Sequence, residues 1–267
     1  MPRPIWSGSI SFGLVNVPVK LLTAVSPKDV RFHQIDSRSK ARVKQKRVSS
    51  TTGEEVPYEE IVKGYEIAPD RYVVIEPEEL EALDPKSTKT IDIEDFVDLD
   101  TIDPVYFERP YYLVPEKGGV KAYALLRDAM RETNKVGIAR MVLRTKQYLA
   151  AIRPVGNALV IETMLFDDEV VHEDEIDGLP GDEVEVSDKE MKIARSLIDS
   201  LSTDFEPAKY RDEYRDRVLE MIEAKAEGQE VVVAEAPAEE PAKVVDLMAA
   251  LEASLGEVKK ARAKKGA

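Results

Sequence analysis

The segment SISFGLVNVPVKLLTAV, residues 9–25, is the clearest indication of the fold class in this chain. Its apolar residues alternate or run together and include many β-branched types, as in a strand. Gly13 and Pro18 interrupt the pattern, which is typical of a bent strand or of a strand at a sheet edge. The chain is therefore expected to begin with β-structure.

The sequence that follows predicts more strands than helices. An extended stretch spans 30–48, and the turn-like Ser49-Ser50-Thr51-Thr52-Gly53 should lead it into 55–68. Further strand-like runs lie at 71–76, 90–97, 105–114, 136–145 and 148–166. Many short strands joined by polar turns predict a barrel or a sandwich, so the fold class is expected to be mainly β with some α.

Four helices are expected among and after these strands, at 120–132, 188–201, 207–227 and 242–258. Ser187 and Glu190 form a capping box at the start of the second helix. Pro207 suits the start of the third helix, and Gly228 suits its end. Residues 229–241 are rich in Ala, Glu and Pro, as in a linker. We therefore expect a body with a helical arm at 1–228, the arm spanning 187–228, then a linker at 229–241 and a tethered helix with a basic tail at 242–267.

Composition restricts the class of protein. The 267 residues include no cysteine, so disulfides and thiolate metal sites are excluded and a reducing cytosol is the expected location. The first eleven residues lack the apolar core of a signal peptide. No run approaches the roughly 20 apolar residues that span a bilayer. A cytoplasmic protein without a membrane segment is expected.

The charges are strongly segregated along the chain. The net charge is −14, yet residues 1–47 carry ten Lys and Arg against Asp29 and Asp36. Residues 118–161 carry eight bases against two acids, whereas 54–117 and 162–190 are strongly acidic. Binding responds to local potential, so such a chain can present a positive face to a polyanion despite its overall charge.

The segment RSKARVKQKR, residues 38–47, is the most basic part of the first third. Its cations at 38, 40, 42, 44 and 46 all occupy even positions, so a strand would place them in one row about 26 Å long. Such a row fits the phosphates of a duplex. The competing interpretation is a solvated edge strand whose lysines discourage aggregation.

The same parity recurs at 136–146. Ile138, Arg140, Val142, Arg144 and Lys146 would share an outward face, and Ala139, Met141, Leu143 and Thr145 the core face. No helix-turn-helix, zinc-finger or basic-zipper pattern accompanies these segments, so contact with phosphates without base readout is expected.

Catalysis finds little support in the sequence, and we expect no enzymatic activity, cofactor or metal. Only His33 and His172 are available, and no Walker loop or nucleophile elbow is present. The acidic residues Glu173, Asp174, Glu175 and Asp177 lack the spacing of a calcium loop. Two alternatives stay open: an adaptor whose basic segment binds an acidic protein, and a metal-dependent nuclease using the acids of 167–177.

Several blocks, in order along nearly the whole chain, resemble the bacterial Ku family. They are IWSGSISFGLVNVPVKLLTA (5–24), RFHQI (31–35), EEVPYEEIVKGYE (54–66), DPVYFERPYYLVP (103–115), KAYALLRDAM (121–130), TNKVGIARMVLR (133–144), FEPAKYRDEY (205–214) and KVVDLMAALEASL (243–255). One departure is clear, since some relatives have Cys-x-x-Cys where this chain has Ser49-Ser50-Thr51-Thr52.

The resemblance implies a homodimeric ring with a Ku-type β-barrel core, a DNA-encircling bridge and a helical arm that embraces the other subunit. It implies loading on double-stranded DNA ends in non-homologous end joining, for double-strand break repair, and the recruitment and stimulation of DNA ligase D. The segment 38–47 matches the family's bridge, and 246–255 matches its ligase-recruiting segment.

These expectations define three groups of candidate site residues. The expected DNA-binding residues are Arg31, Arg38, Lys40, Arg42, Lys44, Lys46, Arg47, Arg140, Arg144 and Lys146. A DNA-binding tail would consist of Lys259, Lys260, Arg262, Lys264 and Lys265. The partner-binding stripe of the terminal helix would consist of Val244, Leu247, Met248, Leu251 and Leu255. That stripe could equally fold back onto the chain's own body, as amphipathic stripes often do.

Overall fold

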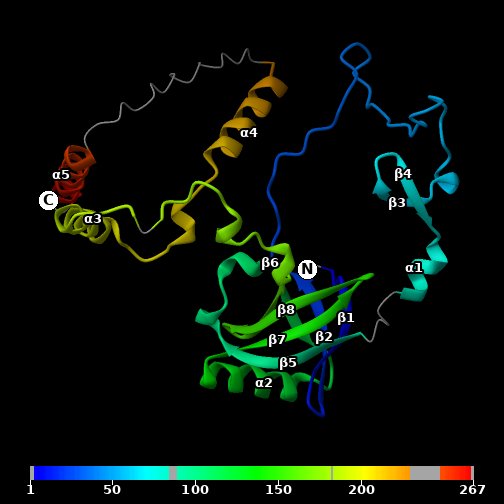
Figure 1. The fold of residues 1–267 in the computed structure, drawn as a ribbon, viewed down its shortest axis with the longest axis horizontal. Coiled ribbons are helices and arrows are strands. Elements are labelled where there is room, and N and C mark those ends of the chain that lie inside the picture. Colours follow the sequence, from blue (N-terminus) through cyan, green and yellow to red (C-terminus); the bar gives the residue numbers. More distant parts are fainter. Residues whose placement is uncertain (1–2, 84–88, 182, 229–246, 266–267) are drawn as a thin grey trace. The chain divides into compact units, whose positions relative to one another are not determined.

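A computed structural model describes residues 3–83, 89–181, 183–228 and 247–265 (Figure 1). The chain divides into two compact units, which are described separately below. The first unit comprises residues 1–28 and 33–175, and the second comprises 29–32 and 176–267. The linker predicted at 229–241 lies outside the described residues, and the three-part division of the chain stays a prediction.

The opening segment forms a hairpin and not one bent strand. β1 (Trp6–Phe12) pairs antiparallel with β2 (Val15–Thr23), and Gly13 in the connecting turn has a φ of +58°. That left-handed backbone is one that glycine adopts without strain. The prediction of an edge strand is also wrong, because β1 pairs on its other side with β5 (Thr90–Asp98) and β2 pairs with β6 (Phe107–Pro115).

The expected barrel is confirmed as a closed sheet of seven strands. Their order is β1-β2-β6-β9-β8-β7-β5, with β7 at Lys135–Leu143, β8 at Lys146–Val155 and β9 at Ala158–Met164. All neighbours pair antiparallel except β1 and β5, which run parallel and complete the closure. Closure leaves no barrel strand with an unpaired edge.

The core of the first unit lies inside the barrel, with one helix packed against it. Ile10, Leu21, Ile91 and Ile161 are completely buried there. The helix α2 (Val120–Thr133) buries Tyr123, Leu126 and Met130, one face of a helix. The hydroxyl of Tyr123 donates to the Leu113 carbonyl (2.7 Å) and accepts from the Leu159 amide (2.6 Å), which joins α2 to β6 and β9.

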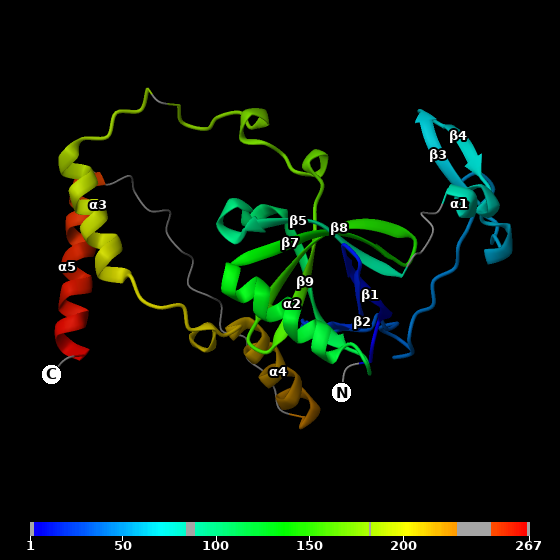
Figure 2. The same ribbon diagram turned by 90° about the horizontal axis from the view of Figure 1, so that it is seen from below.

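A long excursion connects β2 to β5. Within it, β3 (Lys63–Ala68) and β4 (Arg71–Ile75) pair antiparallel as a separate two-stranded sheet, and α1 (Pro77–Leu83) follows them (Figure 2). The sequence predicted strands close to β3 and β4 but no helix at α1. Large apolar side chains of the excursion are solvent-exposed, among them Phe32, Tyr58, Tyr65 and Tyr72.

Where the structure describes it, the second unit contains three α-helices, α3 (Asp188–Leu201), α4 (Glu213–Ala226) and α5 (Leu247–Lys265). The capping box is confirmed, since the Ser187 hydroxyl accepts from the Glu190 amide and the Glu190 carboxylate accepts from the Ser187 amide. The single helix predicted at 207–227 is wrong. Residues 207–209 form a 3-10 turn, and α4 starts only after Asp212, whose carboxylate accepts from the Arg215 amide.

The C-terminal helix is longer than predicted. Residues 242–246 lie outside the described residues, and α5 continues past 258 to Lys265, so the backbone of the supposed tail is helical. None of the helices within the described residues is long and apolar enough to cross a bilayer.

Candidate nucleic-acid interface

The basic ribbon, defined here as residues 31–47, is not a continuous strand. The chain reverses direction within it, where a single bridge joins Ile35 to Arg42. It reverses again just after the ribbon, where a single bridge joins Val48 to Glu55. The Asp36 carboxylate accepts from the Arg38 amide (3.0 Å) and from the Ser39 hydroxyl (2.7 Å), and these bonds hold the turn. The same two hydrogen bonds lower the pKa of Asp36, because they favour its charged form.

The expected single row of Arg38, Lys40, Arg42, Lys44 and Lys46 is therefore wrong. Lys40 has a φ of +57°, a left-handed conformation in which strand alternation is lost. The prediction failed because an acidic residue that caps a turn, Asp36, precedes the basic segment. The cations nevertheless remain exposed on the same short ribbon.

Four cations of the ribbon have neither an ion pair nor a ring contact within the described residues. Arg31, Lys40, Arg42 and Lys44 are exposed, and none forms an ion pair within the part of the chain that the structure describes. Arg38 lies 3.7 Å (Nε to Oδ1) from Asp36, and its side chain is almost fully exposed. Cations without ion pairs that lie in one short segment of chain create a positive potential that favours a polyanion.

The turn at 49–53 is confirmed and supports a pocket beside it. The Ser49 amide donates to the Glu54 carbonyl (2.8 Å), the Gly53 amide donates to the Ser49 carbonyl (2.9 Å), and Gly53 has a φ of +72°. The paired segments on either side bring Lys46 within 2.5 Å (Nζ to Oε2) of Glu55. The chain thus forms a second small hairpin at the end of the basic ribbon.

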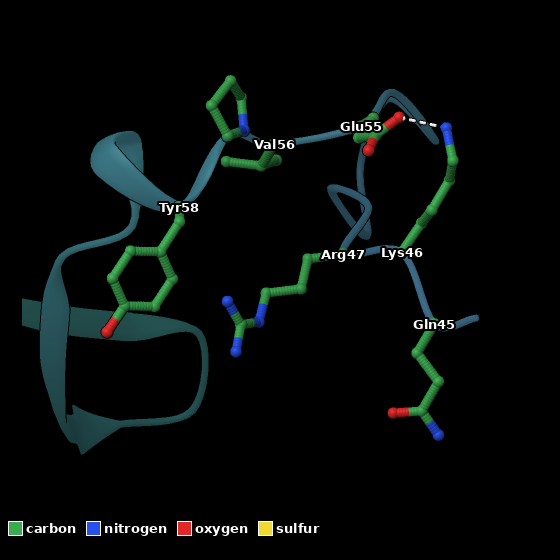
Figure 3. A pocket seen from close by; sticks show the side chains of 7 residues that line it. Gln45, Lys46, Arg47, Glu55, Val56 and Tyr58 are labelled. Carbon is green, nitrogen blue, oxygen red and sulfur yellow. Dashed lines mark hydrogen bonds and ion pairs between the residues drawn. The ribbon is translucent and has the colours of Figure 1, made fainter.

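An open pocket lies between the arms of this hairpin and the residues after it. Gln45, Lys46, Arg47, Glu55, Val56, Pro57 and Tyr58 line it (Figure 3). The Arg47 guanidinium carbon lies 5.1 Å from the centre of the Tyr58 ring, within the range of a cation–π contact. Sequence reasoning missed Tyr58, because it lies in an acidic stretch after the turn and only the fold brings it to Arg47.

The second predicted basic face, at 136–146, is only partly correct. Ala139 and Met141 are buried and Arg140 is exposed, as alternation predicts. However, β7 ends at Leu143, Arg144 occupies the turn with a φ of +61°, and Lys146 begins β8. Arg144 and Lys146 therefore do not continue the face of Arg140.

Two of these three cations already have acidic neighbours. Arg140 lies 3.3 Å (Nε to Oε1) from Glu94, a residue at the β5 bulge. Lys146 lies 3.5 Å (Nζ to Oε1) from Glu169 and 5.2 Å from the centre of the Tyr148 ring. The pKa of Glu169 is lowered, first by the hydrogen bond from the Phe166 amide and then by Lys146. These exposed pairs are weak, and phosphate could replace the carboxylates.

The acidic segment at 167–177 does not gather its side chains. No group of three or more His, Asp or Glu side chains is placed to hold a metal ion within the described residues. Asp167 accepts from the Tyr106 hydroxyl (3.0 Å) and lies 3.7 Å (Oδ1 to Nε2) from His172. The described geometry of this segment therefore offers nothing in favour of a nuclease.

The C-terminal candidates are described only in part. Val244 lies outside the described residues. Leu247 is exposed, whereas Met248, Leu251 and Leu255 are partly buried on one side of α5. For Lys259, Lys260, Arg262, Lys264 and Lys265 the structure gives the helical backbone, and their role as a tail stays a prediction.

Comparison with known proteins agrees with this architecture. Residues 11–193 match the family model of the Ku70/Ku80 β-barrel domain. The chain is 53% identical over 258 residues to the non-homologous end joining protein Ku of Anaeromyxobacter sp. (strain K), covering 96% of this chain and 86% of the relative. It is 42% identical over 265 residues to that of Coxiella burnetii (strain RSA 331 / Henzerling II), covering 97% and 96%.

A further relative is the non-homologous end joining protein Ku of Bacillus subtilis (strain 168), 42% identical over 252 residues, which are 94% of this chain and 81% of the relative. The chain thus combines a barrel of the matched type with an exposed basic ribbon between β2 and β5. Its relatives align with nearly its full length. The chain belongs to the Ku family.

Proposed function

We propose that this protein binds double-stranded DNA ends without reading their sequence and acts in non-homologous end joining. The relatives that cover nearly the whole chain carry that name. The observation that carries the proposal is the exposed basic ribbon, with seven Lys and Arg against Asp36 between residues 31 and 47. Binding of this kind depends on phosphate contacts, while base readout needs side chains placed in a groove.

We further propose that the binding form is a ring-shaped homodimer. Large apolar side chains are exposed both in the excursion and in the second unit, where Phe205 stacks on Tyr210 with ring centres 5.7 Å apart. Phe205 and Tyr210 are 77% and 68% exposed, more than a lone soluble chain needs to leave in water. A second copy of the chain would cover such surfaces, and closed homodimers are the commonest oligomers.

Recruitment and stimulation of DNA ligase D is the third element of the proposal. It is supported by Met248, Leu251 and Leu255 in the first part of α5, which have the spacing of apolar residues in a helix that docks in a groove. No residue of the described site requires a cofactor, and the proposed role is that of a scaffold with no catalysis of its own.

The proposal is tested by comparing one DNA sequence in linear and covalently closed circular form. A ring threads only onto a free end, so stable retention at moderate salt is expected on the linear form alone. Blocking both ends of the linear DNA with bulky hairpins should abolish loading. Equal retention on circles and linear DNA would refute threading, and a lack of binding to either form would refute the DNA-binding role.

A further inference from the structure

The terminal helix α5 lies against α3 within the second unit. The two helices run side by side in both ribbon views (Figures 1 and 2), and the Lys189 Nζ lies 4.0 Å from the Glu252 Oε1 across their contact. Met248, Leu251 and Leu255 of α5 are partly buried, whereas Ala249, Ala250 and Ala253 are exposed. The apolar stripe of α5 therefore faces α3.

The surface of α3 that receives this stripe is continuous. Glu190, Ile193, Ala194, Leu197 and Ser200 are the partly buried residues of α3, and they recur every three or four positions. That spacing defines one side of a helix, matched in period to the stripe of α5. Met191, Ile198 and Leu201 remain exposed, so the contact uses only part of the apolar surface of α3.

We propose that α3 is the docking surface of the chain's own α5 and withholds α5 from its partner. The inference rests on the proposed recruitment of the ligase, because Met248, Leu251 and Leu255, three of the five side chains assigned to that partner, face α3. One apolar stripe cannot occupy two grooves at once, so the partner must compete with α3. The buried side chains are few and only partly covered, which makes the docked state easy to displace.

The contact itself can be tested without any partner. The chain has no cysteine, so Lys189→Cys with Glu252→Cys introduces the only two thiols. A short bis-maleimide should join them within one chain, in the full-length protein. The matched control is Arg195→Cys with Glu252→Cys, because Arg195 is exposed on the opposite side of α3. No product within one chain, or a product only between chains, would overturn the docking.

Withholding is tested by releasing α5 without altering it. Leu197→Glu places a charge in the docking surface, while Arg195→Glu adds an acid on the far side of the same helix. If α5 is docked in about nine molecules of ten, Leu197→Glu should tighten binding of DNA ligase D about tenfold and Arg195→Glu should not. Unchanged affinity in Leu197→Glu would overturn the withholding.

The two experiments separate the inference from the proposed function. DNA ligase D should also reduce the cross-linking between positions 189 and 252, because bound partner and bound α3 exclude each other. If neither the parent chain nor Leu197→Glu binds the ligase, the recruitment proposal and the withholding both fail. The cross-linking experiment decides separately whether α5 docks on α3. End binding, measured alongside, should be equal in all of these variants.

Discussion

Arg47 lies over the ring of Tyr58, with its guanidinium carbon 5.1 Å from the ring centre, at the end of the basic ribbon. The contact ties the two sides of the hairpin that also pairs the Val56 amide with the Arg47 carbonyl (2.9 Å). A cationic side chain is thus held in place by an exposed aromatic ring, and among the described residues no carboxylate forms an ion pair with it.

Replacing this ring should loosen the hairpin. Tyr58→Leu removes a cation–π contact of about 0.5–1 kcal/mol at an exposed site, so amide exchange at Val56 should speed up roughly two- to fivefold. Hydrogen exchange followed by mass spectrometry measures this change. Tyr58→Phe keeps the ring and should exchange like the parent chain; equal rates in the leucine variant would show that the ring does not hold the hairpin.

The cations without acidic neighbours should dominate the salt dependence of DNA binding. Lys40, Arg42 and Lys44, replaced together by Gln, should lower the slope of log affinity against log salt by about 0.9 for each phosphate that the variant no longer neutralises. Fluorescence anisotropy with a short duplex at several salt concentrations gives the slope. The matched control replaces Lys20, Lys117 and Lys121, three cations outside the excursion between β2 and β5, by Gln. A slope that changes only in the control would place the phosphate-binding residues elsewhere.

The Tyr123 hydroxyl should be important for the stability of the barrel. Tyr123→Phe leaves the Leu113 carbonyl and the Leu159 amide without this partner, which costs about 1–3 kcal/mol of unfolding free energy. Chemical denaturation followed by circular dichroism measures the loss. Leu125→Ala, a change at an exposed position of the same helix, should have little effect. If Leu125→Ala lost as much unfolding free energy as Tyr123→Phe, the loss would come from any change in α2 and not from the missing hydroxyl.

Tyr123 also makes the stability of the chain depend on pH, in a direction that follows from its pKa. Burial raises the pKa of Tyr123 in the folded chain, so its stabilising contribution is complete below the ordinary tyrosine pKa of 10.0. The contribution is lost as the pH rises through the higher folded value, because the unfolded chain ionises first. The stability difference between the parent chain and Tyr123→Phe should therefore shrink above about pH 10. A difference that stays constant to higher pH would contradict this assignment.

Removal of residues 230–267 should separate end binding from ligase stimulation. The deletion leaves the barrel, the basic ribbon and α4 intact and removes α5. Retention on linear DNA should stay within about twofold of the parent chain, while stimulation of DNA ligase D is lost. Nick-sealing and gel-shift assays at equal protein concentration measure both. Undiminished stimulation would place the ligase contact in the remaining chain.

Much of the barrel could be predicted because its strands carry a strong local pattern. In β7, Ala139 and Met141 alternate with Arg140, and the structure buries the first two and exposes the third. The ends of the strands were harder to predict. Arg144, for example, has a left-handed backbone conformation that its residue type does not favour. Turn conformation at such positions depends on the neighbouring strands rather than on local sequence.

The candidate interface was predictable in composition but not in shape. The cations of the ribbon are visible in the sequence, yet the turn held by Asp36 converts the predicted row into a reversal of the chain. The pairing of β1 with β5, which closes the barrel, could not be predicted from local sequence either. Ile10 and Ile91 pair although about eighty residues of chain lie between them. The contact of α3 with α5 likewise joins segments that lie far apart in the sequence.

The order of the strands in the barrel also determines how long strand edges stay unpaired during synthesis. The hairpin β1–β2 leaves the ribosome with one side of β1 unpaired, and the strand that covers it is made only after the whole excursion. An uncovered strand edge is a template for pairing with other chains. When residues 90–92 emerge they cover β1, but β2 still lacks β6 and β5 still lacks β7. Nascent chains of this protein therefore carry unpaired strand edges until β9, the last strand of the barrel in chain order, has been made.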